Sequence, residues 1–221
     1  MKQELGWYFP DGETHLPDWM RQAKQMRDGV LQYQLRKYEL ALGFVRQRRT
    51  AVDVGGHVGQ WSRNMAKDFS AVHAFEPVPD YAECWRANMA GVDNARLHPV
   101  ALGAEPGIVS LRCGTPGSHG DTFVAPRDQA NAALDVKQLQ LDQFDLLDVD
   151  LIKIDCEGYE VFVVRGAEAT IKRDRPCVIV EQKPGHATKY GLGETEAVDL
   201  LLSWGARRRA TISGDYVLSW D

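Results

Sequence analysis

The chain of 221 residues lacks the features that mark several classes of protein. It has few cysteines, and none is spaced as a C-x-x-C pair or a zinc knuckle: Cys84, Cys113, Cys156 and Cys177. No apolar run approaches the roughly 20 residues that a membrane-spanning helix needs, and the N-terminus shows no apolar signal segment. We therefore expect free thiols in a reducing compartment, no membrane span, and a cytoplasmic protein.

An excess of positive charge is also missing. Lys and Arg number 26 against 31 Asp and Glu, which gives a formal net charge of -5. Binding duplex nucleic acid over a broad face requires a clustered positive field. The two short basic clusters, Arg46–Arg49 and Arg207–Arg209, are explained as solvated faces. A nucleic-acid partner is therefore not favoured, and the sequence leaves a homodimer open.

What the sequence does have is a regular alternation of short apolar runs and helical segments from residue 50 onward. This alternation predicts a parallel sheet covered by helices on both faces, with ligands bound outside the carboxyl ends of the strands. Residues 113–135, rich in Gly, Pro, Ser and Asp, are predicted to be a loop. The predicted strands are 50–54, 71–75, 95–100, 107–112, 149–154, 177–181 and two within 206–220, and the predicted helices are 58–68, 79–90, 141–147, 161–172 and 194–204.

The first 48 residues have a different pattern. Helices are predicted over 17–28 and 30–48, so we divide the chain into an N-terminal helical extension, 1–48, and a catalytic domain, 49–221. Aromatic residues between Trp7 and Trp19 could form a lid over a planar substrate or cover the back of the sheet, and we favour the second. Tyr33 and Gln34 stay candidates for the substrate pocket.

Two motifs follow the first two strands of the alternating region. The first strand ends in Asp53-Val-Gly55-Gly56-His-Val-Gly59, a glycine-rich turn that lets backbone N–H groups approach a ligand closely. The second ends in Glu76-Pro77, 23 residues after Asp53. An acidic side chain at about this distance can accept hydrogen bonds from the two ribose hydroxyls of a nucleoside. Together they predict a nucleoside cofactor site.

The glycine spacing favours S-adenosylmethionine (SAM) over a dinucleotide. The G-x-G-x-x-G pattern of NAD-binding folds is missing. Asp53 would repel a pyrophosphate but could hold the ammonium group of a methionine moiety, directly or through water. The rival hypotheses are an NAD(P)-dependent oxidoreductase and a non-catalytic binding module. The binding module is disfavoured by the acids present at the strand ends, namely Asp53, Glu76, Asp155 and Glu157.

Over residues 50–182 the sequence resembles the FkbM family of class I SAM-dependent methyltransferases. The resemblance rests on the two motifs above, on Val100-Ala101-Leu-Gly, and on Ile152-Lys-Ile-Asp155-Cys-Glu157-Gly-Tyr-Glu160. It implies an α/β fold with a Rossmann-like, seven-stranded, mostly parallel sheet whose last strand is antiparallel. It also implies SAM as methyl donor and O-methylation of a small molecule or sugar. An amine or nucleic-acid acceptor is the alternative.

The resemblance also implies roles for individual residues. Asp53, Gly55, Gly56 and Gly59 would cradle the methionine end and ribose, and Glu76 with Pro77 would bind the ribose. Val100 and Ala101 would border the adenine. Ser118 and His119 lie where the family often closes a loop over cofactor or substrate. These residues, together with Asp155, form the expected cofactor site.

Three carboxylates are expected at the acceptor side of the site. Asp155 and Glu157 follow one predicted strand, and Glu181 ends the next. One of them could act as the base that takes the acceptor proton, or they could only position the SAM amino group and the acceptor. A third reading places a divalent metal on Asp155, Glu181 and Gln182, which we do not favour. His119 is a further candidate base, and Lys153 is expected in a structural ion pair.

Overall fold

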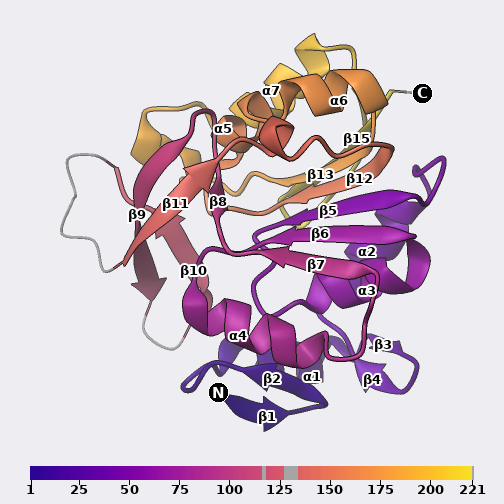
Figure 1. Ribbon diagram of the computed structural model, residues 1–221, viewed down its shortest axis with the longest axis vertical. Coiled ribbons are helices and arrows are strands. Elements are labelled where there is room, and N and C mark those ends of the chain that lie inside the picture. Colours follow the sequence, from indigo (N-terminus) through magenta and orange to yellow (C-terminus); the bar gives the residue numbers. More distant parts are fainter. Residues whose placement is uncertain (116–117, 127–133, 221) are drawn as a thin grey trace.

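A seven-stranded sheet forms the centre of the protein. The structure is a computed structural model that describes residues 1–115, 118–126 and 134–220, with side chains described outside 113–120. Figure 1 shows its strands one below another, with α5 (Glu160–Arg165), α6 (Glu168–Asp174) and α7 (Glu196–Ser203) above them and α4 (Pro79–Asn88) below. Its strands, in spatial order, are β14 (Arg207–Ile212), β15 (Asp215–Ser219), β13 (Cys177–Glu181), β12 (Val149–Ile154), β5 (Thr50–Val54), β6 (Ala71–Phe75) and β7 (Ala95–His98).

The pairing of these strands confirms the predicted fold class. Strands β13, β12, β5, β6 and β7 are mutually parallel, whereas the last strand, β15, runs antiparallel to β13. Every residue of β5, β12 and β13 is buried. Burial on both faces explains why these strands were visible in the sequence as continuous apolar runs.

Alternate strand residues face two different helical layers. Val52, Ile152 and Val178 pack with the helices that follow β12 and β13, and Ala51, Leu151 and Ile179 pack with those near β5. The sheet is therefore covered on both faces. The first layer holds α5 (Glu160–Arg165), α6 (Glu168–Asp174) and α7 (Glu196–Ser203); the second holds α2 (Leu35–Leu42), α3 (Gln60–Asp68) and α4 (Pro79–Asn88).

The segment predicted as one helix over 161–172 is two helices, α5 and α6. The carbonyl of Gly166 accepts a hydrogen bond from the N–H of Asp142, so it does not continue the helical ladder. Asp142 belongs to a 3-10 helix, Leu141–Phe144, where a short helix was predicted. Within the described ranges, every helix is too short or too polar to span a bilayer.

The N-terminal segment contains strands as well as helices. The predicted helix over 17–28 is α1 (His15–Ala23), and the helix predicted over 30–48 is only α2. Between them, Asp28 and Gly29 adopt positive φ angles of 51° and 76° and make the turn of a small hairpin, as Asp-Gly pairs favour. The remaining strands are β1 (Lys2–Glu4), β2 (Trp7–Phe9), β3 (Met26–Arg27) and β4 (Val30–Leu31).

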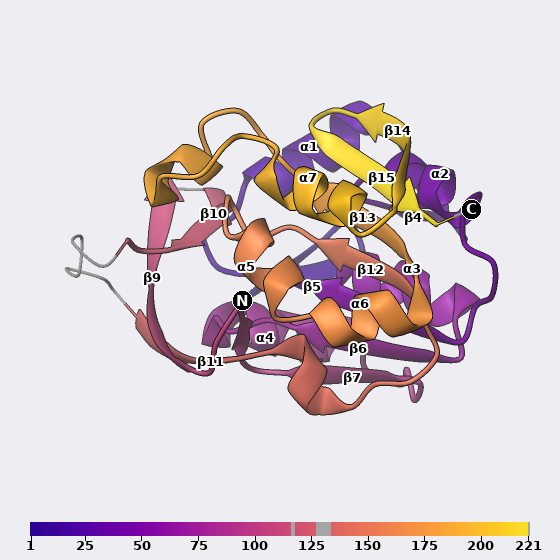
Figure 2. The same cartoon turned by 90° about the horizontal axis from the view of Figure 1, so that it is seen from above.

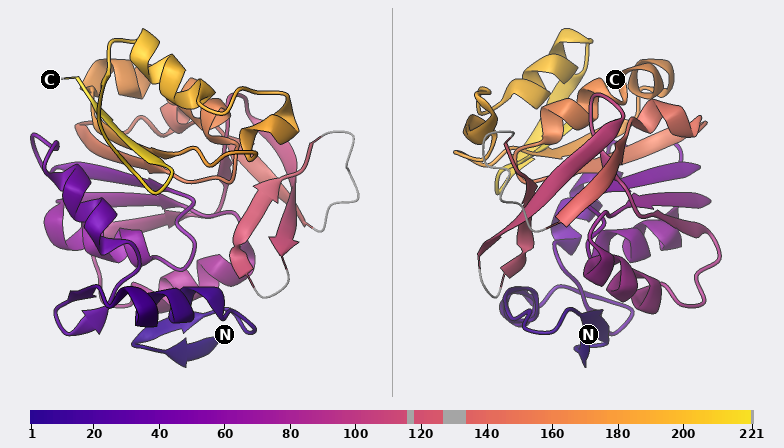
Figure 3. Two further views of the ribbon diagram at one scale, coloured as in Figure 1. Left: turned by 180° about the vertical axis from the view of Figure 1, so that it is seen from behind. Right: turned by 60° about the vertical axis from the view of Figure 1, so that its left-hand side comes forward.

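Trp7 and Phe9 of the N-terminal segment pack beside α4, and not over the back of the sheet, whereas Trp19 packs against Tyr33 with ring centroids 4.8 Å apart. Trp7 and Phe9 are fully buried in one cluster with Val58 and Cys84, and Asn88 of α4 bonds both backbone groups of Tyr8 at 2.7 and 2.8 Å. In Figures 1 and 3 this indigo segment lies at the opposite end of the molecule from α5–α7. The segment therefore packs against Val58, which follows the glycine-rich end of β5.

A second sheet of four strands stands to one side of the large one (Figure 2). The prediction of a loop over 113–135 was wrong for most of its described parts, because the segment carries the end of β9, β10 and the start of β11, and only 125–126 lie outside strands. Thr122, Phe123 and Val124 of β10 favour strands, but the surrounding Gly and Pro residues hid this signal. The strand order is β10 (Ser118–Val124), β9 (Gly107–Thr115), β11 (Leu134–Leu139) and β8 (Ala101–Leu102).

Candidate functional site

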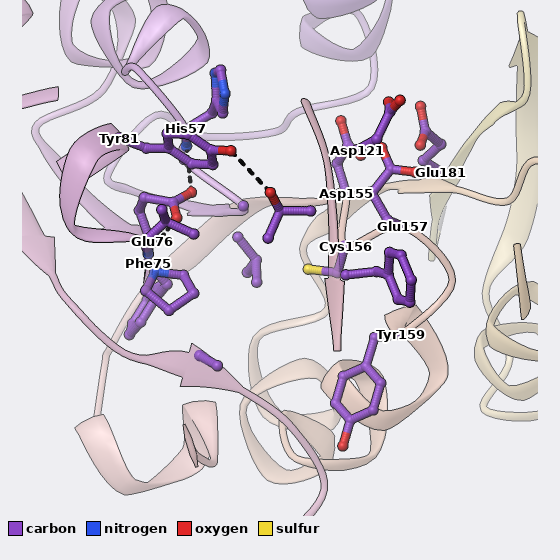
Figure 4. Close-up of a pocket in the computed structure, with 18 of the residues that line it drawn as sticks. His57, Phe75, Glu76, Tyr81, Asp121, Asp155, Cys156, Glu157, Tyr159 and Glu181 are labelled. Carbon is purple, nitrogen blue, oxygen red and sulfur yellow. Dashed lines mark hydrogen bonds between the residues drawn. The ribbon is translucent and has the colours of Figure 1, made fainter. Parts of the chain in front are cut away.

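A cavity lies at the carboxyl ends of β5, β6, β12 and β13, where an open α/β sheet binds its ligands. It encloses about 1190 Å³ of space outside protein atoms, part of it open to solvent. Figure 4 shows Glu76 on one side and a group of carboxylates on the other.

The glycine-rich turn after β5 forms part of the cavity wall. Gly55 and Gly56 line it, together with His57 and Val58. Gly55 has a φ of +74°, and a Cβ atom there would lie 2.0 Å from the carbonyl oxygen of Asp155. The residue must be glycine because the ends of β5 and β12 approach each other closely.

Replacing Gly55 by Ala is therefore expected to lower the free energy of unfolding by about 2 kcal/mol, through backbone strain and overpacking. Urea denaturation followed by tryptophan fluorescence measures this. Gly193→Ala is the control, because no atom lies within 4 Å of its added Cβ. Equal stability of the two variants would contradict the close approach of the strand ends.

Asp53 lies beneath the cavity. Its side chain is fully buried and accepts a hydrogen bond of 2.6 Å from Ser62. Lys153 Nζ lies 3.5 Å from Asp53 Oδ1 and 3.5 Å from Asp155 Oδ2, and donates to the Gly55 carbonyl at 2.9 Å. Burial alone would lower the pKa of Lys153, but Asp155 and Asp53 raise it above its ordinary value. Lys153 thus stays charged and ties the two strand ends together.

Glu76 is fixed at the end of β6 with its carboxylate at the cavity. Oε2 accepts a hydrogen bond from the His57 N–H and Oε1 one from the Val78 N–H, each at 2.8 Å. These bonds join the glycine turn to the start of α4. Burial raises the pKa of Glu76 to about 7, although the two N–H donors act in the opposite direction.

An apolar wall continues from Glu76 along the cavity. It is formed by Phe75 and Pro77 at the end of β6, by Val100 and Ala101, and by Leu111 of the second sheet. An apolar surface beside a carboxylate can accommodate a planar base attached to a ribose. The residues of this part of the cavity could therefore hold a nucleoside.

The opposite side, which we call the acidic end, carries the carboxylates of Asp121, Asp155, Glu157 and Glu181 (Figure 4). Burial and the charge of Asp155 raise the pKa of Glu157 to about 8 and that of Glu181 to about 9. Burial would also raise the pKa of Asp155, but Lys153 and Lys183 lower it. At neutral pH the acidic end thus has an ionised Asp155 beside two carboxyls that hold their protons.

Two further segments close the cavity. Thr122 of β10 lies 2.9 Å from the Tyr81 hydroxyl, oxygen to oxygen, and Phe123 lines the wall beside it. From the N-terminal segment, Leu16 and Tyr33 line the cavity as well. The second sheet and the N-terminal segment therefore add to a site that the large sheet begins.

The cavity brings together most of the residues that the sequence singled out. Among the described residues, Asp53 and Gly59 do not line it, because Asp53 is buried below it and Gly59 begins α3 against Trp85. The Ser118 and His119 side chains lie outside the described part. The residues of the expected site that line the cavity are Gly55, Gly56, Glu76, Pro77, Val100, Ala101, Asp155, Glu157 and Glu181.

Gln182 does not join the carboxylates. Its Oε1 accepts hydrogen bonds from the Ala197 and Val198 N–H groups at 3.0 and 3.3 Å, so the amide is directed to the start of α7. Lys183, which the sequence analysis did not consider, lines the cavity and pairs with Glu181 at 2.8 Å. Its position two residues after Glu181 was the available signal. Thr122 and Phe123 had no such signal in a segment dominated by turn formers.

The sequence is similar to those of known methyltransferases. The sequence profile of the "Methyltransferase FkbM domain" family matches residues 53–208. A curated protein named "Methyltransferase 1" from Beauveria bassiana is 28% identical over 144 residues, which are 53% of this chain and 57% of that protein. The chain thus matches little more than half the length of this relative.

Solved structures show the same fold. A methyltransferase FkbM from Methylobacillus flagellatus superposes with a TM-score of 0.53 at 17% identity, over 80% of this chain and 44% of that one. A protein from Streptococcus mutans, assigned as a methyltransferase and solved with S-adenosylhomocysteine (SAH), superposes with a TM-score of 0.50 at 8% identity, over 86% and 97% of the chains. At these identities the likeness concerns the fold alone.

Proposed function

The chain belongs to the FkbM methyltransferase family, and we propose that it transfers a methyl group from SAM to a hydroxyl of a small molecule or sugar. The observation that carries this proposal is that one cavity has two chemically different ends. At one end the carboxylate of Glu76 is held by two backbone N–H groups. At the other, Asp155, Glu157 and Glu181 gather.

The residues at the first end fit SAM. The carboxylate oxygens of Glu76 keep lone pairs for the two ribose hydroxyls, because each accepts one backbone bond in the structure. Phe75 and Ala101 offer the adenine an apolar surface. When bound, SAM supplies a methyl group already activated on a positively charged sulfur.

The protein must then align the acceptor and remove its proton. Lys153 and Lys183 keep Asp155 ionised, so this carboxylate can accept a proton from a hydroxyl placed between it and the methyl donor. An amine acceptor would need less help. Gathering several carboxylates in one cavity is unfavourable in free energy, and an acceptor that must lose a proton gives a reason for it. The arrangement therefore supports a hydroxyl acceptor.

The N-terminal segment, residues 1–48, forms the acceptor-side wall in this proposal. Leu16 and Tyr33 reach the cavity from it, and Gln34 fixes the Tyr33 hydroxyl through a hydrogen bond of 3.0 Å. The segment is thus held beside the cavity by its own contacts. Its aromatic and apolar surface would favour an acceptor with a hydrophobic face.

The proposed activity is tested with SAM carrying a labelled methyl group. The purified chain is incubated with a panel of polyhydroxylated acceptors and a matched panel of amines, and products are identified by mass spectrometry. Transfer to hydroxyl oxygen supports the proposal. Transfer confined to amines would overturn the O-methylation assignment, and failure to bind either SAM or SAH would overturn the methyltransferase assignment.

The affinity for SAH should depend on pH through Glu76. Ribose hydroxyls donate to the ionised carboxylate, so protons compete with the nucleoside, and affinity is lost as pH falls through the Glu76 pKa of about 7. Calorimetric titrations at pH 6 and pH 8 should therefore differ about tenfold, with tighter binding at pH 8. The Glu76→Gln variant, which cannot ionise, should lose this dependence; an unchanged pH profile in that variant would assign it to other groups.

A further inference from the structure

Three side chains at the acidic end converge in a way that the methyl-transfer chemistry does not require. Glu157 follows β12, Glu181 ends β13, and His186 lies in the loop after β13. One ligand atom from each lies within 4.8 Å of the other two. Two carboxylates and an imidazole from neighbouring loops form a donor set typical of divalent transition-metal sites.

One buried carboxylate oxygen of this group lacks a hydrogen-bond donor. The Glu181 side chain is 3% exposed, and its Oε1 pairs with Lys183 at 2.8 Å. Its Oε2 is buried and has no hydrogen-bond partner among the described residues. An unpaired buried carboxylate oxygen is unfavourable, and a bound cation would satisfy it without disturbing the Lys183 pair.

Carboxyl groups also crowd the acidic end. Four carboxylates line this end of the cavity, namely those of Asp121, Asp155, Glu157 and Glu181. Lys183 is bound to Glu181, and Lys153 divides its charge between Asp53 and Asp155. A divalent cation bound here would hold neighbouring carboxylates together in place of their protons.

The local geometry needs only a small adjustment to bind an ion. His186 Nδ1 lies 2.9 Å from Glu157 Oε2, a distance at which both atoms can bind one ion. Ligand atoms around a tetrahedral zinc are about 3.4 Å apart, given bonds of about 2.1 Å. Separations of up to 4.8 Å exceed this spacing by about 1.4 Å, so the side chains must shift by that order to bind one ion.

We propose that Glu157, Glu181 and His186 bind one divalent transition-metal cation of the Mn²⁺ or Zn²⁺ class. The imidazole favours these ions over Mg²⁺ and Ca²⁺, which prefer oxygen ligands alone. The set differs from the Asp155, Glu181 and Gln182 arrangement considered from the sequence, because Gln182 bonds α7. The role of the ion, to stabilise the deprotonated acceptor hydroxyl, rests on the proposed function, whereas its binding does not.

The site is tested by titrating the EDTA-treated, desalted chain with MnCl₂, ZnCl₂ and MgCl₂ in separate calorimetric experiments. The binding of Mn²⁺ is measured independently by the loss of its free-ion EPR signal. We expect one Mn²⁺ or Zn²⁺ per chain and weaker binding of Mg²⁺. Glu181→Gln and His186→Gln should each weaken Mn²⁺ binding about tenfold or more, whereas Glu194→Gln, an exposed acid in the same segment, should not.

Titration of each variant with SAH separates this inference from the proposed function. SAH binding by a variant that has lost Mn²⁺ shows that its cavity is folded and assigns the loss to the metal ligands. Wild-type protein that binds SAH but neither Mn²⁺ nor Zn²⁺ at about 1 mM would overturn the metal site alone. Variants that bind Mn²⁺ as tightly as the wild type would also overturn it, because the ion would then lie elsewhere.

Discussion

Glu76→Gln is expected to weaken SAH binding about 150-fold. The substitution replaces an ionised acceptor by a neutral amide, so two hydrogen bonds from ribose hydroxyls lose their charge assistance. Bonds to charged groups contribute about 1.5–3 kcal/mol each, and a loss of about 3 kcal/mol corresponds to this factor. Isothermal titration calorimetry at pH 8, where the wild-type carboxylate is ionised, measures the difference.

Asp174→Asn is the matched control for this variant. Asp174 also accepts a backbone hydrogen bond, from the Val149 N–H at 3.0 Å, but it lies where β12 begins, at the edge of the sheet away from the cavity. We expect it to bind SAH as the wild type does. Comparable losses in both variants would mean that Glu76 acts through general stability and not through the ligand.

Lys153→Met should lower the free energy of unfolding by about 3–5 kcal/mol, the range found when one partner of a buried ion pair is removed. Lys153 is the cation nearest to the fully buried Asp53. Its loss leaves that carboxylate without a counter-charge and deprives the Gly55 carbonyl of a donor. Urea denaturation followed by tryptophan fluorescence gives the value.

A double variant distinguishes the ion pair from simple loss of packing. Adding Asp53→Asn to Lys153→Met removes the uncompensated charge, so the double variant should be more stable than the sum of the single changes predicts. The Ser62 hydroxyl can still bond the new amide oxygen. Strict additivity of the two changes, or a loss below about 1 kcal/mol for Lys153→Met, would show that the ammonium group does not stabilise the strand ends.

The central strands could be predicted from the sequence because each carries its signal locally. The predicted strands over 50–54, 71–75, 149–154 and 177–181 coincide with β5, β6, β12 and β13. Burial on both faces makes each of them a continuous apolar run, or nearly so, and a glycine or an acid marks its end. The cavity position follows from the same strands, since their carboxyl ends meet at one edge.

The walls of the cavity could not be predicted because they depend on contacts between distant segments. Thr122 meets Tyr81 only when β10 pairs with β9, and the turn-forming residues around β10 concealed that strand. Asp53 was expected at the ligand, and only the fold shows that Lys153 and Ser62 surround it below the cavity. The direction of a side chain at a strand end depends on contacts with the neighbouring strand. A local sequence pattern carries no information about those contacts.

A crystal structure of the chain with SAH tests the central claim most directly. We predict density for the nucleoside in the cavity, with both ribose hydroxyls within hydrogen-bond distance of the Glu76 carboxylate and the adenine against Phe75 and Ala101. The sulfur should face Asp155 at the acidic end. SAH bound elsewhere, or bound in the cavity with Glu76 directed away from the ribose, would contradict the account.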